Sequence, residues 1–562
     1  MTLRLALPAI MLASLLLLPF LDKPFTIDDP LYLRAAEHAL VDPAHPGAFE
    51  QVWNAGERRR LSQYWLGGTL PAYLLAPVAA LGSREWIAHL YQWLWLCLFL
   101  MGSVSVARRM GCDRRQANTV GLLVGSNPVT LAMAATCMPD IMAAALGIWG
   151  LDRVLVFREE QRPSPGVAAG VLLAAAVLCR GNAAVLLVVA ALLLMPSGWS
   201  RLAACYWPLA VTVALAGAWL TLQGGGAEAA SLLVSERNVP RNLVAFLCFS
   251  ALTGPVLVYA LLSAGWRCAA CMAGIAALGF GLSFVHAANL VQYGLASAFG
   301  ICFAAACIWI ARGSRHVAPL VVWLCAGLVV LPYTYFAAKY VLPGVPAAAL
   351  LIVLHAARVR QPCYPLTVAL LIAAGWMAGA AIIVGDTTLA RSQQRAVEQR
   401  IAPAIKRGTT VWAGGQWAFL AYAERAGAKA LANTPPLPQP GDLIVISRLD
   451  YFGRVDRLPI QREHLATWPE RRCGVFVMNR RLSAGFFSNR YGWLPFAFGC
   501  EELNAYDVYR VVPQPPLPAL PANRTAGAPG AVSIAPPRPV VAAAPRAAAI
   551  AAPQAALTLL KN

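Results

Sequence analysis

The sequence predicts an α-helical protein that crosses a membrane many times. Of its 562 residues, 59% are hydrophobic and only 13% are charged, and the mean hydropathy is +0.59. Soluble domains carry about 25% charged residues, so this composition is far outside the soluble range. The apolar residues also gather in runs of about twenty, the length that an α-helix needs to cross the hydrocarbon core.

About thirteen apolar runs are long enough to predict membrane spans. They cover residues 3–21, 86–107, 117–136, 139–157, 165–180, 182–196, 202–222, 242–263, 269–290, 292–311, 317–337, 340–356 and 365–385. With a cytoplasmic N-terminus, nearly every cytoplasmic loop carries arginine, as the positive-inside rule requires. This threading predicts a multi-pass protein of the bacterial inner (plasma) membrane.

The net charge of +19 has the same explanation. The basic residues lie in short clusters between apolar runs, such as Arg108 with Arg109 and Arg114 with Arg115, rather than along one face. Nucleic acid is therefore excluded as an expected partner, whereas the membrane itself is a partner.

The first outer loop, residues 22–85, is too long for a simple connector. It contains two helix-like pieces, at 30–40 and 69–81, and glycines and prolines interrupt the second piece. Counting that piece as a span would place the later arginines outside, so we predict that both pieces lie in the membrane interface. The whole of 1–385 is then the transmembrane domain.

After the last span, the composition predicts a small extracytoplasmic α/β domain over residues 386–512. Strand-like segments at 411–414 and 443–446 flank a helix-like segment at 416–427. Residues 513–562 are rich in Pro and Ala with little to bury, which predicts a disordered tail.

Two cysteines of the C-terminal region, Cys473 and Cys500, would be able to pair if this region is exported. The sequence alone leaves their pairing open.

The most informative polar segment is Asp28-Asp29-Pro30, directly after the first apolar run. Ionised side chains at a bilayer are costly and usually serve a pathway or a reaction. One carboxylate would take a proton from an acceptor group while the other orients it or shares the charge. The alternative is that the pair caps the helix that Pro30 begins, next to Tyr32.

Three further positions lie at predicted outer ends of spans: Asp140 after Pro139, Arg180, and Lys339 with Tyr340. Asp140 would also suit a helix N-terminus, and the two cations would also suit headgroup contacts. Together, the carboxylates and cations favour a phosphate-bearing lipid and an acceptor over an ion path, because no predicted span has a charge securely at its middle.

Short motifs in the first outer loop follow a distinctive order. Residues 27–32 read Ile-Asp-Asp-Pro-Leu-Tyr, residues 42–46 read Asp-Pro-Ala-His-Pro, and residues 70–77 read Leu-Pro-Ala-Tyr-Leu-Leu-Ala-Pro. This order resembles the first outer loop of GT-C class membrane glycosyltransferases of the family 39 type, which include protein mannosyltransferases and aminoarabinose transferases.

Three later motifs extend this resemblance over residues 1–385. Met-Pro-Asp-Ile at 138–141 looks like the family's second-loop motif, and Lys-Tyr-Val-Leu-Pro at 339–343 looks like its Arg-Tyr-x-x-Pro. Cys-Arg-Gly at 179–181 is similar to a Lys-Gly element of aminoarabinose transferases.

The resemblance implies an inverting hexosyl or pentosyl transferase that takes a sugar from a polyprenyl phosphate at the outer face. Asp28 matches the catalytic base and Asp29 its acidic partner. Arg180 and Lys339 match the cations around the donor phosphate, each with the basic residue type exchanged.

The remaining matches concern how the site is organised. Tyr340 accompanies the donor-phosphate cations, and Asp140 and Tyr32 match site-organising residues. Neither the sugar nor the glycan, lipid or protein acceptor is specified.

No cofactor is predicted. A divalent metal remains possible where Asp28 and Asp140 meet His45 or His89, but the spacing of these residues has no metal-binding signature. Two other classes of protein stay open at this point: a lipid or solute transporter, and a non-catalytic envelope assembly protein.

Overall fold

The computed structural model describes residues 2–53, 56–63, 69–195, 199–222, 234–263, 300, 302–311, 317–360, 364–450 and 458–513. The predicted span at 269–290, residues 292–299 and 301 of the predicted span at 292–311, and the predicted tail after residue 513 lie outside these residues. The described residues up to Pro513 belong to one compact unit.

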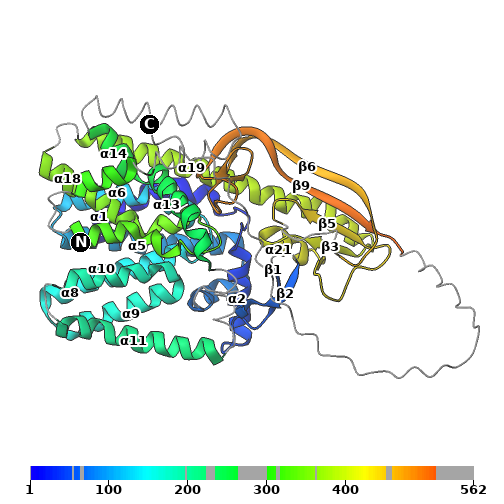
Figure 1. Cartoon of the computed structure of the whole chain (residues 1–562), viewed down its shortest axis with the longest axis horizontal. Coiled ribbons are helices and arrows are strands. Elements are labelled where there is room, and N and C mark those ends of the chain that lie inside the picture. Colours follow the sequence, from blue (N-terminus) through cyan, green and yellow to red (C-terminus); the bar gives the residue numbers. More distant parts are fainter. Residues whose placement is uncertain are drawn as a thin grey trace, which may run out of the picture. The chain divides into compact units, whose positions relative to one another are not determined.

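Helices dominate the described chain (Figure 1). The first half contains α1 (Thr2–Leu17), η1 (Leu18–Phe20), α2 (Asp29–Val41), η2 (Leu61–Gln63), α3 (Leu70–Leu74), α4 (Ala76–Ala80), α5 (Glu85–Arg109), α6 (Arg114–Gly125), α7 (Pro128–Ala134), α8 (Asp140–Glu160), α9 (Pro163–Cys179), η3 (Gly181–Ala184), α10 (Val185–Leu194) and α11 (Trp199–Leu222). The later helices are η5 (Glu236–Asn238), α13 (Val239–Thr253), α14 (Pro255–Ser263), α17 (Val317–Leu324), η6 (Cys325–Val330), η7 (Ala338–Gly344), α18 (Val345–Val359), α19 (Tyr364–Ala396), η8 (Val397–Ile401), α20 (Ala402–Lys406) and α21 (Trp417–Arg425).

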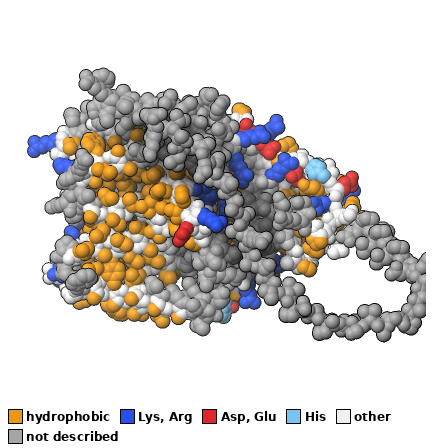
Figure 2. Space-filling view, viewed as in Figure 1, with side chains coloured by type: hydrophobic (Ala, Val, Ile, Leu, Met, Phe, Trp, Pro, Cys, Tyr) orange, Lys and Arg blue, Asp and Glu red, His pale blue; other side chains and the backbone are white. Residues whose placement is uncertain are grey.

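Within the described residues, four helical stretches are long and apolar enough to cross a membrane: Thr2–Phe20, Glu85–Arg109, Ala338–Val359 and Tyr364–Lys406. A fifth candidate is the pair α13 and α14, which is bent by 60°. In Figure 2, hydrophobic side chains predominate among the coloured residues over the helices. The apolar helical architecture agrees with the predicted fold class, while the number of about thirteen spans stays a prediction.

The predicted span at 117–136 is in fact two helices, α6 and α7, because Asn127 and Pro128 start a new helix. The Asn127 side chain accepts hydrogen bonds from the backbone N–H groups of Val129 and Thr130, at 2.9 and 3.3 Å. Pro128 suits the first turn because it lacks an N–H group to satisfy. The predicted helix at 30–40 is α2, and the predicted piece at 69–81 is divided into α3 and α4.

The C-terminal region forms a five-stranded mixed sheet. Its strands are β3 (Val411–Gly414), β4 (Lys429–Ala430), β5 (Leu443–Ser447), β6 (Arg462–Phe476) and β9 (Ala497–Val511), in the order β4-β3-β5-β9-β6. β3 is parallel to β4 and β5, whereas β9 is antiparallel to β5 and β6. The two predicted strands and the helix between them are present as β3, β5 and α21.

Two small hairpins complete the strands of the described chain. They consist of β1 (Glu50–Trp53) with β2 (Glu57–Arg60), and β7 (Met478–Asn479) with β8 (Ala484–Gly485). The first hairpin lies in the segment 22–85, which also contains α2.

The long strands β6 and β9, which run side by side in Figure 1, were not anticipated from the sequence. Their sequences explain why: charged residues interrupt the apolar alternation typical of a strand, for example where Arg472 lies opposite Glu501 and Arg471 opposite Glu502. Cys473 lies opposite Cys500, and the two form a disulfide.

Close packing between α9 and α11 depends on a residue without a side chain. A Cβ atom added to Gly170 of α9 would clash with the carbonyl oxygen of Cys205 and lie 3.2 Å from Cγ of Pro208. Small residues allow helix backbones to approach closely in a membrane.

We therefore expect Gly170→Ala to lower the stability of the folded protein by about 1–3 kcal/mol, the usual cost of overpacking. Thermal unfolding in detergent measures this effect. Gly181→Ala is the matched control, because an added Cβ there meets nothing within 4 Å. Equal melting temperatures for the two variants would contradict the packing argument.

Candidate active site

The side chain of Asp28 is available for chemistry because it does not cap a helix. Asp28 is the residue before α2, yet its carboxylate makes no capping hydrogen bond. Its Oδ2 atom instead lies 3.5 Å from Nζ of Lys339, and 14% of the side chain is exposed. The side chain of Asp28 therefore does not cap α2, and its role as a base stays a prediction.

The neighbouring carboxylate of Asp29 points into the protein. Asp29 is fully buried, and its oxygens accept hydrogen bonds from the backbone N–H groups of Thr26 and Cys137, at 3.1 and 2.8 Å. Burial raises the pKa of Asp29 to about 7. The two adjacent carboxylates therefore occupy different environments.

The loop before α2 is strained where it turns toward the site. Ile27 has a φ of 43°, a conformation that a β-branched residue rarely adopts. Such strain persists only where the surroundings enforce it, and it is concentrated at functional sites. Here the hydrogen bonds of Asp29, two residues after Ile27, hold the loop in this conformation.

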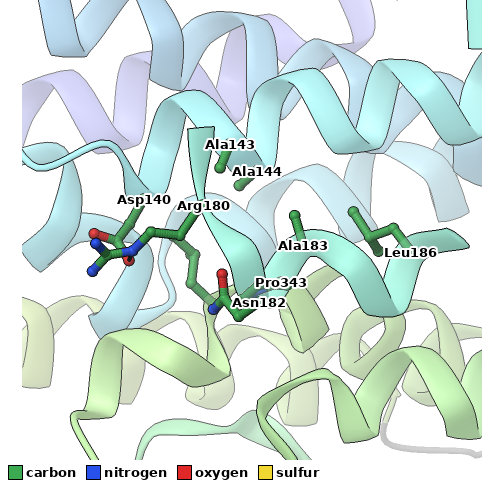
Figure 3. Close-up of a pocket in the computed structure, with 9 residues that line it drawn as sticks. Asp140, Ala143, Ala144, Arg180, Asn182, Ala183, Leu186 and Pro343 are labelled. Carbon is green, nitrogen blue, oxygen red and sulfur yellow. Dashed lines mark hydrogen bonds and ion pairs between the residues drawn. The ribbon is translucent and has the colours of Figure 1, made fainter. Parts of the chain in front are cut away.

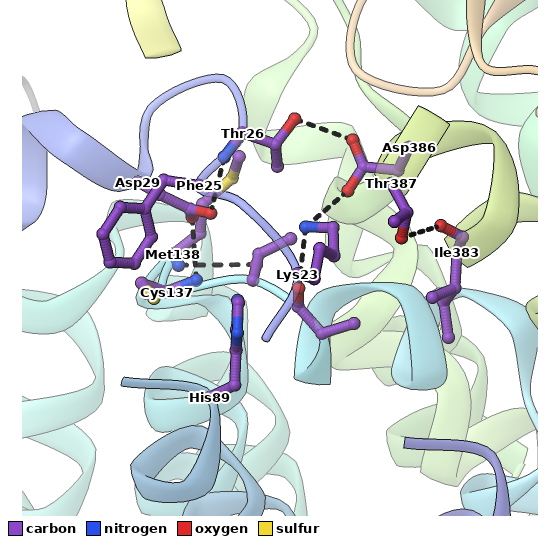
Figure 4. Close-up of polar contacts among 12 residues, drawn as sticks. Lys23, Phe25, Thr26, Asp29, His89, Cys137, Met138, Ile383, Asp386 and Thr387 are labelled. Carbon is purple, nitrogen blue, oxygen red and sulfur yellow. Dashed lines mark hydrogen bonds and ion pairs between the residues drawn. The ribbon is translucent and has the colours of Figure 1, made fainter. Parts of the chain in front are cut away.

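A buried ion pair secures the same loop from the preceding side. Nζ of Lys23 lies 2.8 Å from Oδ2 of Asp386 in α19 and donates to the carbonyl oxygen of Ala135 at 2.9 Å. The hydroxyl of Thr26 donates to the other oxygen of Asp386 at 2.7 Å. Figure 4 shows these contacts converging around Asp386.

The guanidinium of Arg180 joins two other predicted residues. Nε donates to Oδ1 of Asp140 at 3.1 Å, and Nη1 donates to the hydroxyl of Tyr32 at 2.7 Å. Burial raises the pKa of Tyr32, so this phenol stays protonated. Among the described residues, Nη2 of Arg180 is buried and has no hydrogen-bond partner.

Lys339 and Tyr340 lie on η7, between Asp28 and Arg180. Lys339 is only 2% exposed, and its Nζ is 3.2 Å from the sulfur of Met138. The Tyr340 ring centroid lies 5.8 Å from Cζ of Arg180 and 5.9 Å from Nζ of Lys339, within the range of cation–π contacts. The buried Lys339 and the partly exposed Arg180 thus share one aromatic neighbour.

Two pockets open at these residues. The arginine pocket has about 250 Å³ of space free of protein atoms, open solvent included, and is lined by Asp140, Ala143, Ala144, Arg180, Asn182, Ala183, Leu186, Leu342 and Pro343 (Figure 3). The aspartate pocket has about 270 Å³ by the same measure and is lined by Ile27, Asp28, Pro30, Leu31, Arg34, Gln51, Trp417 and Ala421. The Asp28–Lys339 contact connects the aspartate pocket to the cations beside the arginine pocket.

The structure brings the predicted residues together through direct contacts, although the carboxylate of Asp29 faces Cys137 rather than Lys339. Lys23, Thr26 and Asp386 were missed. Asp386 directly follows the apolar run at 365–385, and Lys23 lies two residues after the run at 3–21. A charge in such a position was the signal that would have found them.

The histidines considered as metal ligands lie in different surroundings. His45 contacts Asp42 at 3.0 Å on an exposed loop. His89 lies near Asp29 and Cys137 instead of Asp28 and Asp140.

Comparison with known proteins finds similarity only among solved structures. No protein-family model matches the sequence, and no curated protein matches it. Two of the similar structures are described as glycosyltransferases by name. One is the apo oligosaccharyltransferase of Archaeoglobus fulgidus, at 13% identity and a TM-score of 0.43, covering 77% of this chain and 64% of that chain.

Two further structures are similar. ArnT from Cupriavidus metallidurans bound to undecaprenyl phosphate has 14% identity and a TM-score of 0.47, covering 79% of this chain and 93% of that chain. The mycobacterial arabinofuranosyltransferase AftD has 14% identity and a TM-score of 0.42, covering 91% of this chain and 40% of that chain. Values this low carry no activity or substrate over to this chain.

The buried Lys23–Asp386 pair makes a stability prediction. Lys23→Met or Asp386→Leu alone leaves an uncompensated buried charge, so each is expected to cost about 3–5 kcal/mol. The double variant is expected to cost clearly less than the sum, because it leaves no lone charge. Thermal unfolding in detergent of all four proteins measures this coupling.

The control for this experiment is Arg481→Met, which breaks an ion pair with Glu501 whose arginine side chain is 79% exposed. Exposed pairs contribute about 0–1 kcal/mol, so little change is expected there. Strict additivity of the two buried substitutions would contradict the prediction.

Proposed function

We propose that this chain is an inverting glycosyltransferase that moves a sugar from a polyprenyl-phosphate donor to an acceptor at the outer face of the membrane. The observation that carries the proposal is the meeting of the Asp28 carboxylate, which does not cap a helix, with two cations, the buried Lys339 and Arg180, whose side chain is 13% exposed. Asp28, Arg180 and Lys339 also lie in the sequence motifs that resemble those of GT-C glycosyltransferases.

The arginine pocket suits the donor. The buried Nη2 of Arg180 has no partner among the described residues, and an unpaired buried cationic donor is costly unless it binds an anion. A phosphate oxygen would satisfy it, and Lys339 would supply a second positive charge. Alanine and leucine side chains line much of the remaining pocket, which suits the start of a prenyl chain.

The aspartate pocket suits the acceptor. Asp28 forms part of its lining together with Arg34, Gln51 and Trp417. Polar groups beside an aromatic ring are typical of sites for hydroxyl-bearing ligands. An acceptor in this pocket would meet Asp28 from the side opposite the phosphate cations.

The reaction follows from this arrangement. Asp28 takes the proton from an acceptor hydroxyl, whose oxygen attacks the anomeric carbon of the donor sugar. The bond from that carbon to the phosphate oxygen breaks, and Arg180 and Lys339 stabilise the charge that develops on the leaving polyprenyl phosphate. A single displacement inverts the configuration, and the proton on Asp28 leaves through the aspartate pocket.

The other site residues position these groups. Asp140 and Tyr32 hold the Arg180 guanidinium through two different nitrogens, and Tyr340 packs beside both cations. Asp29 holds the loop that presents Asp28, so in this proposal it acts on the base through the backbone. The site and the disulfide-bonded C-terminal sheet would face outside the bacterial inner membrane, where disulfides persist.

Asp28→Asn tests the base. We expect normal folding and a turnover lowered by about 10²–10⁴-fold, the usual contribution of a general base. The measurement is release of polyprenyl phosphate from a panel of polyprenyl-phosphate sugars, with a membrane extract as the source of acceptor.

The matched control is Asp42→Asn, which removes a carboxylate that contacts Ala44 and His45 on the exposed loop after α2. This variant is expected to keep the wild-type rate. Wild-type turnover in Asp28→Asn would overturn the assignment of the base, and no release from any sugar by folded wild-type protein would overturn the proposed function.

Lys339→Met tests the donor site. Hydrogen bonds to charged groups contribute about 1.5–3 kcal/mol, so binding of the polyprenyl-phosphate donor should weaken by about 10- to 100-fold. Lys339→Arg is expected to recover part of this loss, and Lys406→Met, at an exposed position on α20, is the control. Direct binding of undecaprenyl phosphate measures the effect, and unchanged affinity in Lys339→Met would contradict this role.

A further inference from the structure

Three side chains of different chemistry converge in the interior behind Asp28. Asp29 comes from the start of α2, His89 from α5, and Cys137 from the segment between α7 and α8. Each offers one ligand atom, and these atoms all lie within 4.8 Å of one another. All three residues are buried, and Figure 4 shows His89 extending from α5 toward the other two.

The histidine is prepared to act as a ligand. Its Nδ1 lies 2.8 Å from the carbonyl oxygen of Leu21, which can accept a hydrogen bond from this nitrogen. Such a bond places the ring proton on Nδ1 and leaves the lone pair on Nε2, the arrangement typical of metal-bound histidines. Among the described residues, Nε2 is buried and has no hydrogen-bond partner.

The other two groups also retain the capacity to bind an ion. Each oxygen of Asp29 accepts one backbone hydrogen bond and has a further lone pair. Cys137 is a free, fully buried cysteine. Its thiolate would be the soft ligand of the set.

The local charges are compatible with a divalent cation. A carboxylate and a thiolate together balance two positive charges, and the histidine adds a neutral nitrogen. The cation whose charge acts on Asp29 and His89 is Lys23, which is already paired with Asp386 at 2.8 Å. The ion would therefore not have to be bound beside an unpaired positive charge.

We propose that Asp29, His89 and Cys137 form a binding site for one Zn²⁺ ion. One oxygen, one imidazole nitrogen and one sulfur are ligands that zinc accepts, and three protein ligands leave the fourth position of a tetrahedron for a small molecule such as water. The ion would bind the start of α2 to α5 and to the segment between α7 and α8. This inference goes beyond glycosyl transfer and does not depend on it.

The experiment is metal analysis of the full-length protein, purified in detergent without chelators and equilibrated with equimolar zinc. We expect about one zinc per chain in the wild type and at least a tenfold loss of affinity in His89→Gln and Cys137→Ser, since even outer-shell changes cost 10–100-fold. Zinc is also expected to raise the melting temperature of the wild type but not that of the variants.

The controls are chosen to match each ligand. His355→Gln removes a buried histidine that bonds to Tyr259, and Cys112→Ser removes another buried free cysteine. Cys268→Ser/Cys271→Ser removes the CxxC pair of the sequence. All three are expected to keep the wild-type zinc content.

Either of two results would overturn the site. One is a wild type that binds no zinc, and the other is zinc that is lost when Cys268 and Cys271 are replaced but retained when His89 and Cys137 are replaced.

If the ligand variants do not fold, cobalt(II) replaces zinc in the wild type and in the Cys268→Ser/Cys271→Ser variant. A thiolate-to-cobalt charge-transfer band in both supports the site, and its absence from that double variant overturns it. No glycosyl-transfer assay is involved, so failure of this proposal is separate from failure of the proposed function.

Discussion

The ion pair between Lys23 and Asp386 is the interaction on which the site depends. It joins residues on the first loop and on α19, and it is almost completely shielded from water. Removing two charges from water is expensive, so such a pair persists only with good geometry and additional hydrogen bonds. Thr26 and the carbonyl oxygen of Ala135 supply those bonds. Because α19 also contacts β6 and α21, the pair links the start of α2 to the C-terminal sheet.

Adjacent aspartates have separate tasks because of the turn at Ile27. The positive φ of Ile27 and the start of α2 direct successive side chains to different sides of the loop. Asp29 satisfies backbone N–H groups in the interior, while Asp28 remains beside Lys339 with part of its surface exposed. A carboxylate that bonds inward is a structural support, and a carboxylate that is only loosely contacted can exchange a proton with a ligand.

Segments far apart in the sequence contribute one charged group each to the site. Asp28 follows the first apolar helix, Asp140 begins α8, Arg180 follows α9, and Lys339 lies on η7. Each is at the end of a helix or in a short turn, where a polar side chain can leave the apolar surroundings. Arg180 lines the arginine pocket, Asp28 lines the aspartate pocket, and Lys339 contacts Asp28. In the function proposed above, the first pocket would receive the lipid-linked sugar and the second the acceptor.

The sequence by itself determined the apolar helices, the position of α2, the short strands β3 and β5, and the charged residues at helix ends. These features depend on local composition, proline and periodicity, which act within a few residues. Only the tertiary structure decided that Asp29 faces inward, that Lys23 pairs with Asp386, that β6 pairs with β9, and that His89 meets Cys137. Those outcomes depend on contacts between distant segments, and the free energy of burying a charge or a ligand set is defined only once those segments have packed together.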